Sequence, residues 1–143
     1  MRAWQLPAGS DSFNALALAD LPQPEPGPGE VLVRVRACSI NYRDFAVAAG
    51  KYFGGALQSP AVPLSDGAGE IAGVGAGVTG LAVGDRVQSS FFPLWVEGPH
   101  RMGPALGDGT SPGMLAEYVV GAAPGGGARG ARRRVAPAPG PAR

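Results

Sequence analysis

The feature that most constrains the fold of this chain is a run of alternating side chains between residues 30 and 40. Small apolar residues occupy every second position from Val31 to Ala37, while Arg34 and Arg36 occupy the positions between them. Successive side chains of a β-strand point to opposite faces of the sheet, so this period of two predicts a strand over residues 30–40 with one buried side. The apolar positions 31, 33, 35 and 37 are expected on the inner face.

Glycine and proline divide the rest of the first 120 residues into short segments. The 143 residues include 24 Gly and 15 Pro. The stretch PQPEPGPG at residues 22–29 predicts an extended surface connector, because proline fixes φ and has no N–H to donate. Residues 41–50 predict a short helix, with Asn41 as the N-cap and Gly50 past its end. Further strands are expected at residues 2–6, 15–18, 70–74, 81–87 and 114–120, so the fold class is mainly β with one or two short helices.

Length and charge exclude several classes of protein. A chain of this length forms one domain, and its net charge of +1 does not suit a strongly basic nucleic-acid binder.

No run of 18 apolar residues predicts a membrane span, and the N-terminus lacks the apolar core of a signal peptide, so we expect a cytoplasmic protein. The single cysteine, Cys38, and the single histidine, His100, cannot form a disulfide or fill a zinc site alone, and both are interpreted as structural or incidental.

The C-terminal 23 residues differ in character from the rest of the chain. Residues 1–120 carry seven basic and eleven acidic side chains, whereas residues 121–143 carry five arginines and no acidic residue. All but one of these 23 residues are Ala, Gly, Pro or Arg, whose codons can be written in G and C alone. The composition favours a disordered tail translated from GC-rich DNA in a shifted reading frame. A natural disordered tail and a patch that binds nucleic acid, through Arg129, Arg132, Arg133, Arg134 and Arg143, are the alternatives.

A GxGxxG pattern occurs at residues 75–80. In a dinucleotide-binding protein this pattern lies between a strand and a helix whose N-terminus meets the pyrophosphate. The sequence that follows here, LAVGDRV, has no helical pattern. These glycines are therefore predicted to serve turns, and no phosphate-binding loop is expected in the chain.

Two longer segments are far more specific. Residues 30–44 (EVLVRVRACSINYRD) and residues 63–78 (PLSDGAGEIAGVGAGV), closed by VGDRV at 83–87, resemble the medium-chain dehydrogenase/reductase family. The opening MRAW and the segment LAEYV at residues 115–119 extend the resemblance over almost all of residues 1–120. The resemblance is to the N-terminal, GroES-like part of the catalytic domain, and it implies a partly open β-barrel.

The resemblance also distinguishes between branches of that family. Zinc alcohol dehydrogenases have a ligand cysteine at the position of Asn41 and a His-Glu pair at the positions of Ser65 and Asp66. Neither Asn nor Ser is a usual zinc ligand, and residues 92–109 lack the four cysteines of the family's structural zinc lobe. The sequence is therefore similar to the zinc-independent quinone oxidoreductases, and no metal site is expected.

The resemblance implies roles for several side chains, and each has a structural alternative. Asn41 would face the nicotinamide and act in catalysis, or it only caps the helix. Tyr42 would donate to a substrate oxygen, or it only packs, and Asp44 would be catalytic, or it only stabilises the helix start. The substrate wall implied by the resemblance consists of Tyr52, Ser65, Phe92 and Trp95. Aromatic loop residues are as often core fillers, and Ser65 and Asp66 also suit a turn.

The implied activity is hydride transfer between NAD(P)H and a small carbonyl or quinone substrate. The family binds NAD(P)H in a Rossmann domain that is expected to be absent from this chain. Residues 1–120 are thus interpreted as the substrate-side domain of a truncated oxidoreductase that binds no cofactor or zinc and is inactive alone. The alternative is a non-catalytic binding or assembly module, which could self-associate through exposed apolar surface.

Overall fold

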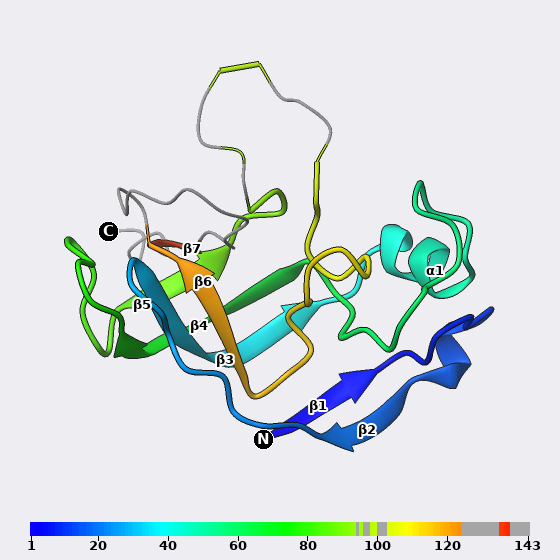
Figure 1. Ribbon diagram of the computed structural model, residues 1–143, viewed down its shortest axis with the longest axis horizontal. Coiled ribbons are helices and arrows are strands. Elements are labelled where there is room, and N and C mark those ends of the chain that lie inside the picture. Colours follow the sequence, from blue (N-terminus) through cyan, green and yellow to red (C-terminus); the bar gives the residue numbers. More distant parts are fainter. Residues whose placement is uncertain (94, 96–97, 100–102, 124–134, 138–143) are drawn as a thin grey trace, which may run out of the picture.

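The computed structural model describes residues 1–93, 95, 98–99, 103–123 and 135–137. Its elements form two antiparallel sheets and one α-helix (Figure 1). The strands are β1 (Arg2–Gln5), β2 (Ala17–Asp20), β3 (Glu30–Ser39), β4 (Asp66–Val74), β5 (Arg86–Ser89), β6 (Tyr118–Ala122) and β7 (Val135–Pro137). The helices are the 3-10 turn η1 (Phe13–Ala15) and α1 (Tyr42–Ala48). The mainly β class expected from the sequence is confirmed, and the sheets stay open rather than closing into a full barrel.

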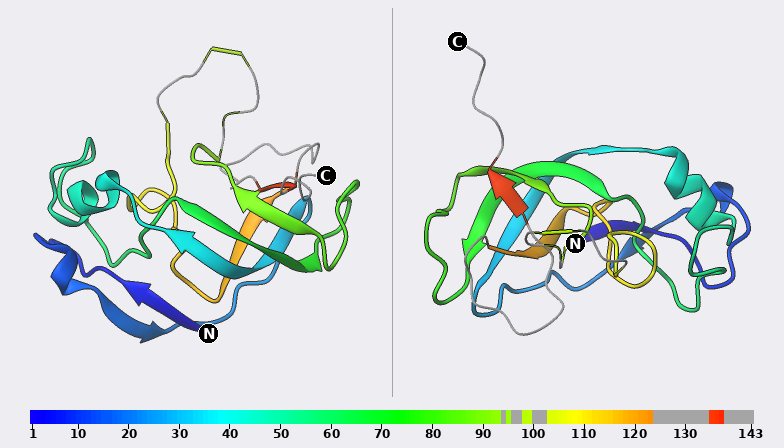
Figure 2. Two further views of the ribbon diagram at one scale, coloured as in Figure 1. Left: turned by 180° about the vertical axis from the view of Figure 1, so that it is seen from behind. Right: turned by 90° about the horizontal axis from the view of Figure 1, so that it is seen from above.

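The larger sheet has the strand order β6-β3-β4-β5-β7, and the smaller sheet pairs β1 with β2. Isolated bridges join the N-terminal strand to the rest of the molecule, between Ala3 and Ala116 and between Leu6 and Ala61. Seen from above in Figure 2, α1 and the β1-β2 pair lie at the same end of the molecule, away from β5 and β7. The five-stranded sheet therefore carries α1 at one end, directly after its interior strand β3.

Only the first half of β3 keeps the predicted inner face, and Leu32 on the opposite face is buried there as well. Val31 and Val33 are buried and Arg34 is exposed, as expected. The pairing of β3 with β4 then shifts between Val35 and Ala37, so that two residues of β3 face one residue of β4. A β-bulge of this kind inverts the faces beyond it. The inward position predicted for Ala37 is wrong: Ala37 is exposed, and Cys38 packs against the core instead.

Two apolar clusters stabilise the fold. The first lies between the strands of the larger sheet and the 106–123 segment, and it consists of Val31, Val33, Ile71, Val87, Leu106, Met114, Val119 and Ala123. The second lies beneath α1 and consists of Leu6, Val47, Ala48, Leu57 and Ala61. Since Val47 and Ala48 lie on one side of α1 and are buried, the second cluster fixes which side of the helix faces outward.

The helix predicted over residues 41–50 is confirmed as α1. Asn41, at the N-cap, has extended backbone angles, and its N–H donates to the Asp44 carboxylate, 2.8 Å from Oδ2. Gly50, with φ of 66°, follows the end of the helix, where a left-handed conformation suits glycine. The start and end of α1 are therefore set by local sequence.

Several strand boundaries differ from the sequence predictions. Residues 81–85 form a turn, in which the N–H of Ala82 donates to Asp85 Oδ2 and Gly84 has φ of 96°, so β5 begins only at Arg86. Strand β2 begins two residues later than expected because η1 occupies residues 13–15. Strand β6 continues to Ala122, beyond the expected tail boundary after residue 120, and Ala123 is buried. The backbone of β7 pairs with β5, whereas residues 124–134 and 138–143, with their five arginines, lie outside the described residues.

Candidate functional site

Three of the polar residues singled out in the sequence meet beside α1. Ser39 at the end of β3 pairs with Asp66 at the beginning of β4, so the residues just beyond these two strand ends are neighbours. The Asn41 side-chain amide donates to Asp66 Oδ2 at 2.9 Å, and the Ser65 hydroxyl donates to Asp66 Oδ1 at 3.2 Å. Asp66 is exposed and Ser65 is buried. The cluster therefore presents the Asn41 amide and the Asp66 carboxylate at the end of the sheet, with the Ser65 hydroxyl buried behind them.

Asp44 extends this cluster into the interior. Its carboxylate is fully buried and accepts the Asn41 N–H, while the Asp44 N–H donates to the Asn41 carbonyl at 3.0 Å. Burial raises the pKa of Asp44, and the negative charge of Asp66 adds to this effect, whereas the hydrogen bond from Asn41 and the charge of Arg43 oppose it. Asn41 is thus held by two aspartates, one through its backbone and the other through its side chain.

The backbone beneath Asp66 is fixed by its neighbours. The Ser89 hydroxyl donates to the Ser65 carbonyl at 2.7 Å and accepts the Gly67 N–H at 3.0 Å, so one side chain holds both sides of Asp66. Leu64 has a positive φ of 72°, which is unusual for a residue with a branched side chain. Its carbonyl accepts the Met114 N–H at 2.9 Å, and Leu64 itself is buried. The segment that presents Ser65 and Asp66 is therefore held by packing despite its local strain.

Arg43 is a residue of this region that sequence reasoning missed. Its side chain is only 10% exposed, and its guanidinium carbon lies 4.8 Å from the centre of the Tyr52 ring and 4.7 Å from that of Phe91. The closest carboxylate oxygens are those of Asp44, at 3.6 Å, and Asp108, at 3.7 Å. No local pattern signals this burial, because an arginine in the first turn of a short helix is ordinarily exposed.

Two cavities adjoin the cluster. One, of about 420 Å³, is lined by the strand ends, including Asp66, Gln88 and Ser89. The other, of about 370 Å³, lies against α1 and is lined by Tyr42, Phe45, Ala46, Ala49, Lys51, Tyr52 and Phe53. The Tyr42 side chain is almost free in solvent at 88% exposure, whereas Tyr52 is partly buried. The structure thus brings Tyr42 and Tyr52 to one cavity and Asp66 to the other, where Asn41 and Ser65 are connected through their hydrogen bonds to Asp66.

Phe92 and Trp95 are not among the described residues that line either cavity. The Phe92 ring packs edge-on against Phe91, 4.5 Å between centres. The Trp95 indole N–H donates to the Gly98 carbonyl at 3.1 Å, and its ring is half exposed. The Phe92 ring thus contacts Phe91, which itself lies against Arg43, and the substrate roles expected for Phe92 and Trp95 stay predictions. His100 lies outside the described residues.

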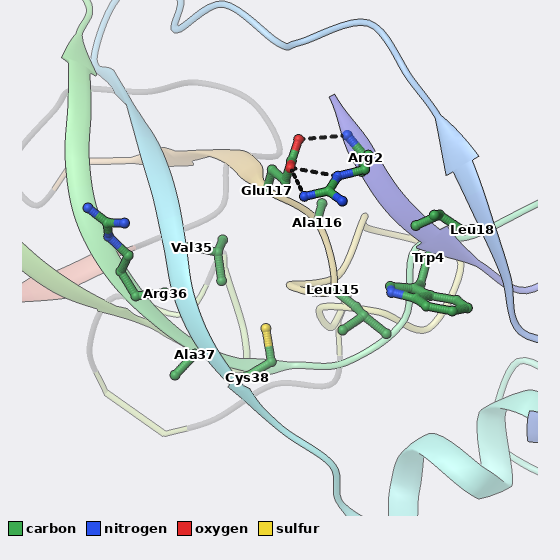
Figure 3. A pocket seen from close by; sticks show the side chains of 10 residues that line it. All are labelled: Arg2, Trp4, Leu18, Val35, Arg36, Ala37, Cys38, Leu115, Ala116 and Glu117. Carbon is green, nitrogen blue, oxygen red and sulfur yellow. Dashed lines mark hydrogen bonds and ion pairs between the residues drawn. The ribbon is translucent and has the colours of Figure 1, made fainter.

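A third cavity, larger than these two, lies elsewhere, where β1 diverges from β3 (Figure 3). Its volume is about 520 Å³, with Trp4 and Leu18 on one side and Cys38 across from them. The Arg2 and Glu117 side chains pair at its rim, 2.9 Å apart. The Cys38 thiol donates to the Met114 carbonyl at 3.0 Å, and burial raises the pKa of this thiol, which suits a structural residue better than a nucleophile.

The described part of the chain contains neither a cluster of metal ligands nor a helix that could span a membrane. No group of three or more His, Cys, Asp or Glu side chains there is arranged to hold a metal ion. Neither of the two helices in that part has the length and hydropathy needed to cross a bilayer. The GxGxxG segment forms a turn whose next element is β5, so the prediction that these glycines serve turns is confirmed.

The strand order and the single helix after β3 define a GroES-like β domain of the kind found in dehydrogenases. Residues 27–125 match the family model described as the alcohol dehydrogenase GroES-like domain. The chain therefore belongs to this family, within the medium-chain dehydrogenases and reductases.

Several known proteins resemble the chain. It is 44% identical over 94 residues to a zinc-type alcohol dehydrogenase-like protein of Schizosaccharomyces pombe, an alignment that covers 64% of this chain and 27% of the relative. A solved NAD-dependent alcohol dehydrogenase is 37% identical, with a TM-score of 0.69, over 84% of this chain and 37% of that one. The quinone oxidoreductase of Coxiella burnetii is 25% identical, with a TM-score of 0.65, over 85% of this chain and 34% of that one.

The chain spans about a quarter to two fifths of the length of these relatives. Members of the family are NAD(P)-dependent oxidoreductases that act on small molecules. The family assignment made from residues 30–44 and 63–87 is thereby confirmed, together with the GroES-like fold.

Proposed function

We propose that the chain is the substrate-side domain of a zinc-independent, NAD(P)H-dependent oxidoreductase that reduces a small carbonyl or quinone. The observation that supports this most directly is the hydrogen-bonded cluster of Asn41, Ser65 and Asp66. These are the positions at which the zinc branch of the family carries metal ligands. Here the amide and the hydroxyl donate to the carboxylate, an arrangement that needs no metal to bring the three groups together.

The donor set does not suit zinc. Zinc sites are built from thiolate, imidazole and carboxylate groups, and of these the cluster contains only the Asp66 carboxylate. We therefore derive no step through a metal. Polarisation of a substrate carbonyl falls to hydrogen-bond donors, of which the exposed Tyr42 hydroxyl is the most accessible.

The cofactor fits this chain only in part. The polar cavity beside Asp66 has room for a planar amide-bearing ring, and the Asn41 side chain donates to this Asp66 carboxylate. The described residues have no strand, glycine-rich loop and helix in sequence, so they offer no site for the pyrophosphate. Bound NAD(P)H supplies the hydride. In this proposal Asn41 orients the nicotinamide, Tyr42 and Asp44 act with it in catalysis, and the wall of the substrate site consists of Tyr52, Ser65, Phe92 and Trp95.

The 143 residues alone are expected to show no turnover. With NADH or NADPH and either duroquinone or an aldehyde, the absorbance at 340 nm should stay constant. Oxidation of the cofactor above the rate without protein would contradict this part of the proposal.

Binding of duroquinone tests the site itself. Duroquinone is fully substituted and does not add to the Cys38 thiol, so it probes recognition alone. In ¹H–¹⁵N NMR titrations we expect shifts at Tyr42 and Tyr52 that Asn41→Ala weakens. Asn14→Ala, in the exposed 3-10 turn, is the matched control and should leave the titration unchanged. Shifts confined to the cavity beside Trp4, or no shifts at all, would refute the proposed site.

A second candidate function is a binding or assembly module, favoured by exposed aromatic surface around α1. Phe53 is 83% exposed, Tyr42 is exposed, and Ile40 and Phe45 are more than half exposed. Light scattering after size exclusion distinguishes the two functions. Concentration-dependent association that is abolished by Phe53→Ser would favour the module, whereas a monomer that binds duroquinone favours the oxidoreductase domain.

A further inference from the structure

We propose that Arg43 is a positioning residue, whose planar guanidinium holds the Tyr52 ring on the wall of the cavity beside α1. The inference rests on the proposed function, in which Tyr52 contacts the substrate. Arg43 itself touches neither of the two cavities, since it is not among the residues that line them. Arg43 would therefore influence substrate binding through the position of the Tyr52 ring.

The first observation is the environment of the guanidinium. Its Nε, Nη1 and Nη2 atoms are buried and have no hydrogen-bond acceptor among the described residues. The oxygens of Asp44 and Asp108 approach at 3.6 and 3.7 Å, which is too long for a hydrogen bond. Ion pairing with these two carboxylates offsets the charge of Arg43, but it does not fix the orientation of the guanidinium plane.

The second observation is the stacking. The guanidinium carbon lies within 5 Å of the ring centres of both Tyr52 and Phe91, at distances typical of cation–π contacts. Tyr52 also packs against the second apolar cluster beneath α1, and its ring lies 5.0 Å from that of Phe53. The contact with Arg43 adds a link from the Tyr52 ring to the start of the helix. Because Tyr52 lines the α1 cavity, the position of Arg43 contributes to the shape of that wall.

An anion-binding role for Arg43 is less consistent with the structure. The two neighbouring carboxylates make the surroundings of the guanidinium negative overall. Its nitrogens are also too deeply buried for a ligand atom to reach them without displacement of the aromatic rings. A packing role through Tyr52 and Phe91 accounts for the burial, the stacking and the loose ion pairs together.

The proposed role depends on the planar shape of the Arg43 guanidinium and not on its positive charge alone. Lysine preserves the positive charge, but its ammonium group cannot stack flat on a ring. We therefore compare Arg43→Lys and Arg43→Met with Arg36→Met, which removes an exposed arginine whose ion pair with Glu70 lies on the sheet surface. Val31→Ala, in the core at the far end of β3, controls for loss of stability alone.

The readout is ¹⁹F NMR of the full chain labelled with 3-fluorotyrosine, in which each of the three tyrosines is assigned by its Tyr→Phe variant. We expect the Tyr52 resonance to move by more than its line width in Arg43→Met. In Arg43→Lys, the Tyr52 resonance should lie closer to its position in Arg43→Met than to its position in wild type. The Tyr118 resonance should stay fixed, and neither control should move the Tyr52 resonance.

A folded Arg43→Met protein whose Tyr52 resonance is unchanged would overturn the proposal, as would full rescue by lysine. Should Arg43→Met fail to fold, Phe91→Leu removes one of the stacking rings, and the proposal then requires a smaller movement of the Tyr52 resonance. This readout needs no substrate. Failure of wild-type protein to bind duroquinone would count against the proposed function, whereas an unmoved Tyr52 resonance would count against the role of Arg43.

Discussion

Replacing Ser89 with alanine tests whether the segment that carries Asp66 is held as the structure shows. The Ser89 hydroxyl bonds the Ser65 carbonyl at 2.7 Å and the Gly67 N–H at 3.0 Å. Alanine keeps the β-strand and removes only the oxygen. Both backbone groups then lose their partner at the same time, next to the strained residue Leu64.

The loss of stability in Ser89→Ala follows from the burial of the Ser65 carbonyl and the Gly67 N–H. A buried backbone group without a partner costs about 1–3 kcal/mol. Both hydrogen bonds are only partly buried, so water can replace some of what is lost. Each of the two groups should therefore cost an amount near the low end of this range. We expect the unfolding free energy to fall by about 1–3 kcal/mol for the two groups together. The Gly67 amide should also exchange its hydrogen at least about tenfold faster.

Urea denaturation and amide hydrogen exchange of wild-type and variant proteins measure these two effects. Ser90→Ala is the matched control, because the hydroxyl of this adjacent serine makes only a 3.4 Å contact to the Phe92 carbonyl. Its effect should stay below about 0.5 kcal/mol. Equal stabilities of Ser89→Ala and Ser90→Ala, with unchanged exchange at Gly67, would show that the hydroxyl does not hold the segment.

Three further predictions concern the sheet, the buried carboxylate and the metal-free cluster. Gly69→Ala should lower the unfolding free energy by about 1–3 kcal/mol, since a Cβ there would lie 2.2 Å from the Arg34 carbonyl oxygen; Gly54→Ala, which meets no atom within 4 Å, should be neutral in the same urea assay. Burial raises the pKa of Asp44 above its ordinary 3.8, so the folded protein holds this proton more tightly than the unfolded chain. The unfolding free energy of wild type relative to Asp44→Asn, measured in urea, should therefore fall as pH rises from 3.8 through the raised pKa. A difference that does not change across this pH range would contradict the burial. Asn41→Cys combined with Ser65→His should create a Co²⁺ site with the native Asp66, seen as thiolate charge-transfer absorbance that wild type lacks; its absence would show that the three side chains do not converge.

The elements that the sequence predicted well are those with local signals. Helix α1 begins after an N-cap and ends before a glycine in a left-handed conformation, and both signals lie within ten residues. Val31 and Val33, in the first half of β3, are buried as its alternation predicts. The bulge after Val35 depends instead on the pairing of β3 with β4, where Gly69 allows the Arg34 carbonyl to approach closely. No pattern within β3 itself could reveal it.

Burial of a charged residue is the other feature that local patterns do not reveal. Arg43 looks like a solvated residue of the first helical turn, because its partners Phe91 and Asp108 come from loops far along the chain. Its burial depends on the second apolar cluster, which fixes α1 with Val47 inward and thereby determines where the guanidinium lies. A sequence pattern records the period of a helix but not the loops that cover it.

The convergence of Asn41 with Ser65 and Asp66 follows from strand register rather than from either motif. Asn41 lies 24 residues before Ser65, and each of the two motifs has a local structural explanation, as a helix cap or as a turn. Antiparallel pairing of Ser39 with Asp66 places the exit of β3 beside the entrance of β4, so side chains just outside the ladder must meet. A one-residue slip of that register would turn the Asp66 side chain to the opposite face and separate it from the Asn41 amide. The bulge in β3 and the Ser89 hydroxyl, which fix the register and the backbone at this end, are therefore as necessary to the cluster as its own three side chains.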